Sequence, residues 1–267
     1  MSNRPPSSLP RRADYGSGAY WRSIRLFADR AEAWGELADD FHHFSVRLRH
    51  DGRQILSVEG DGIRVPWTTC PSAKAPLDDL VGTPLGASLR ETWGRSDPRR
   101  QCTHWFDLAC LAWMQATRFC AAGHEQRTYR MQLPDLQERS SRPTLWRDGE
   151  RVIEWSIVGM KILHSSPDRF SELSLRGPAW TSVMQGSRGP IDEDLAEAAW
   201  VLRRGVFIGM GRQYDFDQIQ VASEFAPVVG GACHTFNQPN LDSIQKLPKT
   251  VRDFTDRPDQ LLNRGSA

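Results

Sequence analysis

The stretch Phe44–Gly60, FSVRLRHDGRQILSVEG, decides the fold that the sequence predicts. In its first part Phe44, Val46 and Leu48 alternate with polar residues, which is the period of two typical of a β-strand. The tetrapeptide HDGR then supplies the Asp-Gly pair of a tight turn, and hydrophobic residues resume beyond it. The pattern therefore predicts an antiparallel hairpin.

Further strands and helices surround this hairpin. The stretches YWRSIRLFA (20–28) and GIRVPW (62–67) are strand-like, so we expect a small antiparallel sheet. SAKAPLDDLVGTPL (72–85) predicts a short helix, and THWFDLACLAWMQATRFCA (103–121) predicts a longer one with Thr103 as its N-cap.

The second half of the chain repeats strands and then a helix. EQRTYRMQL (125–133) and TLWRDGERVIEWSIVGMKIL (144–163) are strand-like, and the latter contains a second Asp-Gly turn. IDEDLAEAAWVLRRGVFIGM (191–210) predicts an amphipathic helix with acidic residues in its first turn. The fold class is therefore α+β: an N-terminal antiparallel meander with packed helices, followed by strands and helices that complete one compact unit.

Composition divides the chain into four parts. Residues 1–18 are rich in Pro, Ser, Arg and Gly and predict a disordered lead, and residues 249–267 predict a loosely ordered tail. Between them we expect an α+β half at 19–125 and a second half at 126–248 packed on the first.

Charge and motifs exclude several classes of function. Lys+Arg 34 against Asp+Glu 33 leaves no basic surplus to neutralise phosphates, which argues against nucleic acid as a partner. No apolar run approaches the ~20 residues of a membrane span, and the N-terminus lacks the apolar core of a signal peptide, so a cytoplasmic protein is expected. No GxGxxG after a strand, Walker A or GxSxG motif is present. A small-molecule substrate and a homo-oligomer remain open.

Residues suited to chemistry fall at the ends of the expected elements. ADDFHH (38–43) lies at a predicted strand start, RVPWTTC (64–70) at a strand end, and QCTH (101–104) at a helix start. A cysteine at a helix N-terminus has its thiolate favoured by the helix dipole. Zn or Fe would accept these ligands, Cys70, Cys102 and His104, with Asp40 or His42 as a fourth.

Catalysis without a metal is the alternative. The groups that we expect to act as acids, bases or substrate-binding groups are Asp40, His42, His104, Asp107 and Arg64. The competing interpretation of Cys70 and Cys102 is packing, because free cysteine is among the most buried residue types. We predict that Asp40, Cys70, Cys102 and His104 converge in space. No role is assigned to the pair Cys233-His234.

The motifs DDFHH, RVPWTTCP and QCTH followed by an acidic residue carry a resemblance over about Asp39–Ala116. In these features the chain resembles a bacterial family of unassigned function, whose members have an acidic–His strand start, RxPWxxCP and CTH. That family is associated with bacteria that degrade aromatic compounds, which implies a role in aromatic compound catabolism.

A more distant resemblance is to the NifU/IscU iron–sulfur scaffold, and it rests on the order of elements along the chain. That order is a hairpin, a cysteine, a helix, the stretch LVGTPL, a loop, a cysteine with a nearby histidine, and a second helix. It places Asp40 on the scaffold's ligand-loop Asp, Cys70 on its second cysteine, and Cys102 with His104 near its final His-Cys pair. The scaffold's first cysteine falls at or near Ala38, and its adjacent His-Cys has become Cys-Thr-His. The resemblance therefore implies the fold rather than the function.

Three functions remain as hypotheses. The first is an enzyme that acts by acid–base or metal-assisted chemistry on an apolar, aromatic substrate. Its most concrete form is a lyase that performs C–C cleavage or deformylation of a lignin-derived phenolic compound. The second is a zinc-dependent hydrolase, and the third is a metal or iron–sulfur carrier.

Overall fold

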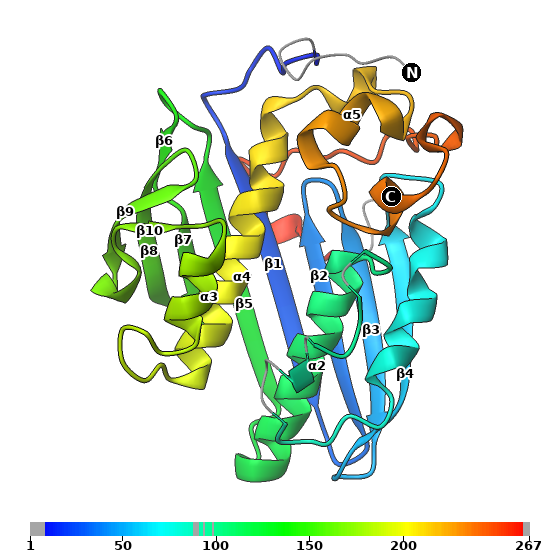
Figure 1. Cartoon of the computed structure of the whole chain (residues 1–267), viewed down its shortest axis with the longest axis vertical. Coiled ribbons are helices and arrows are strands. Elements are labelled where there is room, and N and C mark those ends of the chain that lie inside the picture. Colours follow the sequence, from blue (N-terminus) through cyan, green and yellow to red (C-terminus); the bar gives the residue numbers. More distant parts are fainter. Residues whose placement is uncertain (1–8, 88–90, 93, 98, 264–267) are drawn as a thin grey trace.

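An antiparallel sheet runs through the protein, as a computed structural model of residues 9–87, 91–92, 94–97 and 99–263 shows (Figure 1). Its ten described strands follow the order β10-β9-β8-β7-β5-β1-β2-β3-β4, and β6 pairs with β8. The strands are β1 (Ala19–Ala28), β2 (Glu32–Asp39), β3 (His43–His50), β4 (Ile55–Arg64), β5 (Gln126–Pro134), β6 (Ser140–Ser141), β7 (Thr144–Arg147), β8 (Glu150–Val158), β9 (Lys161–Ser166) and β10 (Leu173–Ser174).

The hairpin predicted around HDGR is confirmed as the pair β3–β4. Phe44, Val46 and Leu48 are buried, whereas the alternate residues Arg47 and Arg49 are exposed. The Asp51 carboxylate accepts hydrogen bonds from the backbone N–H groups of Arg53 and Gln54, and these bonds close the turn. Strands β1 to β4 form the predicted antiparallel meander.

One sheet joins the two predicted halves of the chain. The expected boundary between residues 125 and 126 lies between a helix and β5, and β5 pairs with β1 over nine residue pairs. The α+β class is confirmed, and the halves meet through backbone hydrogen bonds within the sheet.

Two long helices cover the same face of the sheet (Figure 1). Helix α2 packs on β1, β2 and β3, and helix α4 packs on β5, β7 and β8. Gly205 of α4 lies so close to β5 that an added Cβ would stand 1.7 Å from the sulfur of Met131. The helices are η2 (Cys70–Leu80), α2 (Thr103–Ala122), η3 (Asp168–Phe170), α3 (Pro178–Met184), α4 (Glu193–Gly209), η4 (Met210–Gln213), η5 (Phe216–Gln218), α5 (Ala222–Val229), η6 (His234–Asn237), η7 (Leu241–Ser243) and η8 (Pro258–Gln260).

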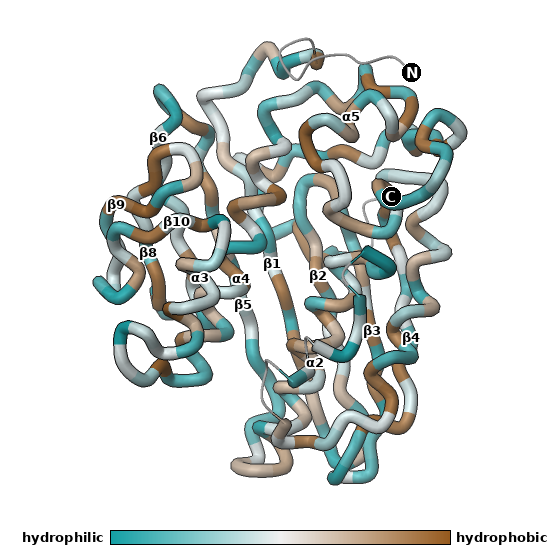
Figure 2. Tube along the Cα trace, viewed as in Figure 1, coloured by the Kyte–Doolittle hydropathy of each residue, from teal (hydrophilic) through white to brown (hydrophobic). Residues whose placement is uncertain are grey.

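The core lies between these helices and the sheet. Hydrophobic segments, brown in Figure 2, recur along β1 to β4. Trp105 and Trp113 of α2 and Trp155 of β8 are among the largest side chains that are fully buried. Tryptophans therefore build the interior on both halves of the sheet.

The structure differs from two sequence predictions about element ends. ADDFHH leads into a strand as predicted, since its last residue His43 begins β3, but its first two residues end β2 and residues 40–42 form the turn between the two strands. Strand β2 itself was not predicted. Thr103 is the first residue of α2 rather than its N-cap, a position that Cys102 occupies without a side-chain hydrogen bond.

The described parts of the predicted lead and tail are held in place. Leu9 is buried, and Arg12 pairs with Asp253 at 2.8 Å. Phe254 and Leu261 are buried and belong to a second hydrophobic cluster with Ala38 of β2. Residues 9–18 and 249–263 thus make specific contacts with the rest of the protein, while residues 1–8 and 264–267 of the predicted lead and tail lie outside the described part.

Within the described residues, no helix combines the length and the apolar character that crossing a membrane requires.

Candidate active site

The site begins at the turn between β2 and β3. Asp39, the last residue of β2, accepts hydrogen bonds on Oδ1 from the backbone N–H groups of Phe41 and His42, at 2.9 and 2.8 Å. The guanidinium of Arg64 donates to the backbone carbonyls of Asp39 at 2.5 Å and His42 at 3.0 Å. Side-chain bonds thus fix the backbone of the turn.

Asp39 is a buried carboxylate with a full set of donors. Its Oδ2 accepts from the Tyr20 hydroxyl at 2.8 Å and from Arg22 Nη2 at 2.6 Å, and its Oδ1 also meets His42 Nδ1 at 3.0 Å. Burial alone would raise the pKa of Asp39, but its interactions with His42 and with the Arg22 cation lower it well below its ordinary value. Asp39 is therefore ionised.

This carboxylate sets the state of His42. An ionised acceptor at Nδ1 requires that Nδ1 carries the hydrogen, so the lone pair of the neutral ring lies on Nε2. Burial lowers the pKa of His42, with Asp39 acting in the opposite direction. A neutral imidazole with a free Nε2 is the form of a general base.

His104, in the first turn of α2, lies against His42. Their ring centres are 3.8 Å apart, with the planes inclined by 30°. Burial, and next the neighbouring His42, lower the pKa of His104 well below its ordinary value. Its Nε2 is buried without a hydrogen-bond partner among the described residues. A buried polar atom of this kind is costly unless a ligand or substrate completes it.

Both histidines line a pocket of about 930 Å³. The cavity lies at the N-terminus of α2, and segments from α4 and the chain after α5 complete it. Its size suits a small molecule. Aromatic rings form much of its wall: Phe41, Phe44, Trp67, Phe216, Phe225 and Phe236.

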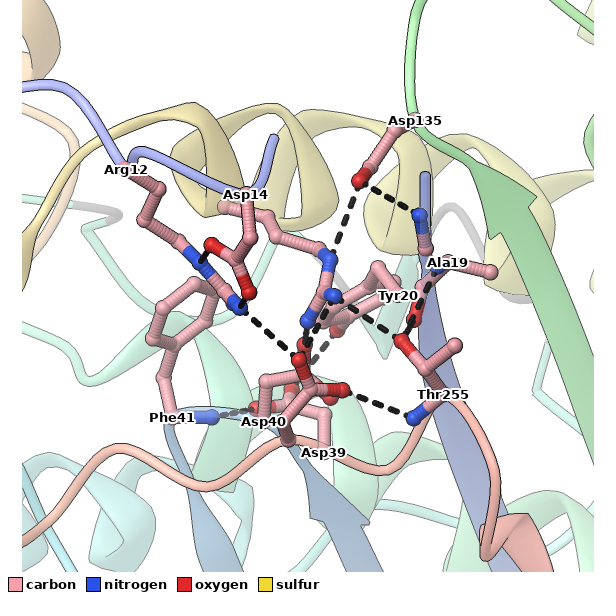
Figure 3. A network of polar contacts seen from close by, with 12 residues as sticks. Arg12, Asp14, Ala19, Tyr20, Asp39, Asp40, Phe41, Asp135 and Thr255 are labelled. Carbon is pink, nitrogen blue, oxygen red and sulfur yellow. Dashed lines mark hydrogen bonds and ion pairs between the residues drawn. The ribbon is translucent and has the colours of Figure 1, made fainter. Parts of the chain in front are cut away.

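Asp40 pairs with Arg212 rather than with the histidines, within a network of polar contacts that Figure 3 draws around Asp39, Asp40 and Asp135. Its Oδ2 accepts from Arg212 Nη1 at 2.8 Å, and Arg212 also binds Asp135 at 3.0 Å and Asp253 at 2.8 Å. Burial raises the pKa of Asp40 to about 8 against the opposing charge of Arg212. Its Oδ1 lacks a partner among the described residues. Asp40 does not line the pocket, so the predicted convergence does not include its side chain.

Two other predicted residues serve the framework. Arg64 Nη1 binds the carbonyls of Asp40 at 3.0 Å and Thr250 at 2.6 Å, in addition to the two carbonyls of the turn. Asp107 pairs with Arg204 of α4 at 2.8 Å. The guanidinium of Arg64 is thus occupied by four backbone carbonyls, which leaves it poorly placed for the predicted anion.

The structure brings Cys70 and Cys102 to the pocket that His104 lines. Burial raises the pKa of Cys70 to about 12, and burial with the neighbouring Cys70 raises the pKa of Cys102 well above its ordinary value. Burial thus opposes the thiolate that the helix dipole is predicted to favour at Cys102. Cys233 and His234, which received no role, also line the pocket.

One group of described residues has the geometry of a metal site. A ligand atom from each of Asp39, His42 and His104 lies within 4.8 Å of the others. Both oxygens of Asp39 already accept several hydrogen bonds, including those from Arg22. Asp39 therefore fits better as the group that orients His42 than as a metal ligand. A carboxylate that is hydrogen-bonded to the second ring nitrogen of a metal-bound histidine is a common arrangement in metal sites.

Sequence reasoning missed Asp39, Tyr20 and Arg22. Asp39 stands beside the predicted Asp40, and a pair of adjacent acids gives no sign of which one faces the site. Tyr20 and Arg22 are two apart on β1, so they share a face of the sheet. That spacing was the signal available, but it has meaning only once β1 is known to pair with β2.

Comparison with models of known protein families gives no match for this chain, and comparison with curated proteins gives none either. The resemblance of residues 39–116 to a bacterial family therefore stays a prediction.

Proposed function

We propose that the protein is an enzyme that acts on an aromatic small molecule by general acid–base catalysis, with His42 as the base. The observation that carries this proposal is the buried series Asp39, His42, His104 at the wall of an aromatic pocket. A base is most effective when it is neutral, oriented and of matched pKa. Asp39 supplies the orientation and burial supplies the neutral state.

Each histidine has its own task in this proposal. His42 takes the proton of a substrate hydroxyl on Nε2, and Asp39 stabilises the imidazolium that forms. His104 stays neutral and binds the substrate beside His42 through its unpartnered nitrogen. Two adjacent imidazoles do not both carry a charge readily, so the proton resides on the one next to Asp39.

The specific reaction that we propose is a lyase reaction on a lignin-derived phenolic alcohol. The substrate first loses its phenol proton together with a hydroxyl or alkoxy group on the benzylic carbon, as water or an alcohol, and so becomes a quinone methide. His42 then removes the proton of a hydroxymethyl group on the next carbon. The C–O bond of that group becomes a carbonyl, and the C–C bond that attaches the group breaks. The electron pair of that bond passes into a conjugated quinone-methide-like ring system, which becomes a phenolate. The products are an aldehyde, formaldehyde in a deformylation, and an unsaturated phenol that recovers the proton from His42.

A panel of phenolic compounds tests this reaction, each with a hydroxyl or alkoxy group on the benzylic carbon and a hydroxymethyl group on the next carbon. We expect aldehyde release by the wild type, and a loss of about 10²-fold or more in His42→Ala and His104→Ala. The matched control is His164→Ala, because His164 is exposed on β9 and does not line the pocket. Full activity in both pocket variants, or no aldehyde from any compound, would contradict the proposal.

A zinc-dependent hydrolase is the second candidate, favoured by the spacing of Asp39, His42 and His104. Catalytic zinc generally has three protein ligands, and the Nε2 of His104 has no hydrogen-bond partner among the described residues. Elemental analysis of protein purified without a histidine tag separates the two candidates. About one equivalent of zinc that is lost in His104→Ala would favour the hydrolase, and a trace amount would favour acid–base catalysis.

An iron–sulfur carrier with the NifU/IscU-like fold has less support. The position expected for the scaffold's first cysteine is close to Ala38, which is buried within β2. The thiols of Cys70 and Cys102 are buried and have raised pKa values, so each would have to ionise against its surroundings to bind a cluster.

A further inference from the structure

The charged side chains of the described residues that line the pocket are all basic. Its described lining includes no Asp or Glu, whereas four basic side chains contribute to it: Arg176, Arg203, Arg204 and Lys246. The carboxylate of Asp107 neutralises Arg204, and that of Asp39 stands behind His42. A cavity lined by charges of one sign concentrates ligands of the opposite sign.

Arg203 is the basic residue best prepared for an anion. Its Nε donates to the Leu175 carbonyl at 2.7 Å, and its guanidinium carbon lies 4.8 Å from the Phe207 ring centre and 5.1 Å from that of Trp180. These contacts fix the side chain and leave the two Nη groups without an ion pair to any described carboxylate. Burial, with the charge of Arg204, lowers the pKa of Arg203 to about 10, so an anion would stabilise its charged form.

The position of Arg203 relates it to the histidines. Arg204 follows it on α4 and pairs with Asp107, which lies one turn after His104 on α2. Arg203 itself lines the same pocket as His42 and His104, although its contacts are with Leu175, Trp180 and Phe207.

We infer that Arg203 binds a planar oxygen anion, carboxylate or phenolate, carried by the ring system of the aromatic substrate. This inference rests on the proposed function, because it takes the same pocket as the substrate site. Guanidinium groups bind such anions through two parallel N–H donors. In the proposed lyase reaction a phenolate at this place would receive the electron pair of the broken bond. The alternative is that Arg203 only anchors α4 to Leu175.

Equilibrium binding tests the inference without any turnover. Isothermal titration would compare 2-naphthoate with its neutral isostere 2-naphthamide, and absorbance would detect whether 2-naphthol binds as its phenolate. The variants are Arg203→Gln and Arg203→Lys. The control is Arg130→Gln, since Arg130 also stacks on a tryptophan, at 5.0 Å from the Trp21 ring centre, but lies outside this pocket.

We expect the wild type and Arg130→Gln to prefer naphthoate over naphthamide by about tenfold or to bind naphthol as the phenolate, because charge-assisted hydrogen bonds are the strong ones. Arg203→Gln should lose this preference while it still binds naphthamide, and Arg203→Lys should keep part of it. The inference would be overturned if the wild type bound naphthoate and naphthamide equally and also bound naphthol in its neutral form, or if Arg203→Gln kept the wild-type preference. If Arg203→Gln does not fold, a weaker preference in Arg203→Lys than in the wild type supports the inference, and an unchanged one overturns it. Aldehyde release and its dependence on His42 test the proposed reaction, whereas the preference for naphthoate tests the role of Arg203. The proposed reaction and the inference about Arg203 can therefore fail separately.

Discussion

At the scale of single residues, two adjacent aspartates show how environment decides chemistry. Asp39 receives donors from Tyr20, Arg22, His42 and the backbone, and its pKa lies well below the ordinary value. Asp40 has Arg212 as its charged partner and one oxygen without a partner, and burial raises its pKa to about 8. At neutral pH one is a carboxylate and the other is largely a neutral acid.

The pH dependence of stability should separate these two aspartates. The pKa of Asp40 in the folded state is above its unfolded value, so its stabilising contribution is complete below about pH 4 and is lost as the pH rises toward 8. We expect Asp40→Asn to remove this loss, which amounts to at most about 1.4 kcal/mol per pH unit. Urea denaturation of wild type and variant from pH 5 to pH 9 measures it.

Asp39→Asn is the matched variant in this experiment. The pKa of Asp39 is depressed in the folded state, so its contribution is present above the unfolded value and is lost only in acid. Its removal should cost about 3–5 kcal/mol at pH 7, because it leaves the buried Arg22 without a counter-ion. An equal loss of stability in Asp40→Asn at pH 7 would show that Asp40 is ionised there.

The sequence predicted the neighbourhood of this site and named Asp40, whereas the carboxylate that the structure places against His42 is that of Asp39. The start of helix α2 lies within one residue of the predicted position. Which of two adjacent acids faces His42 depends on where β2 ends, and a shift of one residue moves every side chain to the other face. Local pattern contains no information about that register.

At the scale of elements, the strands and helices with a strong period were predictable and β2 was not. Its sequence, EAWGELAD, has few residues that favour strands, and five consecutive residues at its end are buried. A strand buried on both faces shows no alternation, so the signal that revealed β3 is absent from β2.

Helix α4 is attached to the rest of the molecule by a buried ion cluster. Glu197 is 1% exposed, accepts a hydrogen bond from the Tyr129 hydroxyl at 2.5 Å, and pairs with Arg118 and Arg127. Glu197→Ala should lower the free energy of unfolding by about 2–3 kcal/mol, because it leaves the buried Tyr129 hydroxyl without its acceptor and the half-buried Arg118 and Arg127 with Asp194 alone. Glu193→Ala, at an exposed position in the first turn, should cost less than about 1 kcal/mol. Similar losses in the two variants would contradict this role of Glu197.

At the scale of the whole molecule, the C-terminal segment closes the structure. Arg212 holds Asp253, Arg252 N–H donates to the Asp40 carbonyl at 2.8 Å, and Phe254 is buried against the sheet. Sequence composition suggested a loose tail because polar residues outnumber apolar ones there. The few long-range contacts that hold it are not visible in composition.

Phe254→Ala tests whether this segment contributes to global stability. We expect a loss of about 3 kcal/mol or more in the free energy of unfolding, from the buried ring and the cavity that it leaves. Leu56→Ala is the control, because Leu56 is 50% exposed. A chemical-denaturation curve for Phe254→Ala that coincides with that of the wild type would mean that the tail is dispensable.

The central claim is that Asp39 holds His42 as a neutral base in the pocket, and ¹⁵N NMR of the imidazole rings tests it most directly. The prediction is that at pH 7 His42 is neutral with its hydrogen on Nδ1, and that its pKa lies below the ordinary value of 6.5. Asp39→Asn should remove the preference for that tautomer. A doubly protonated His42 at pH 7, or a ring with its hydrogen on Nε2, would contradict the account.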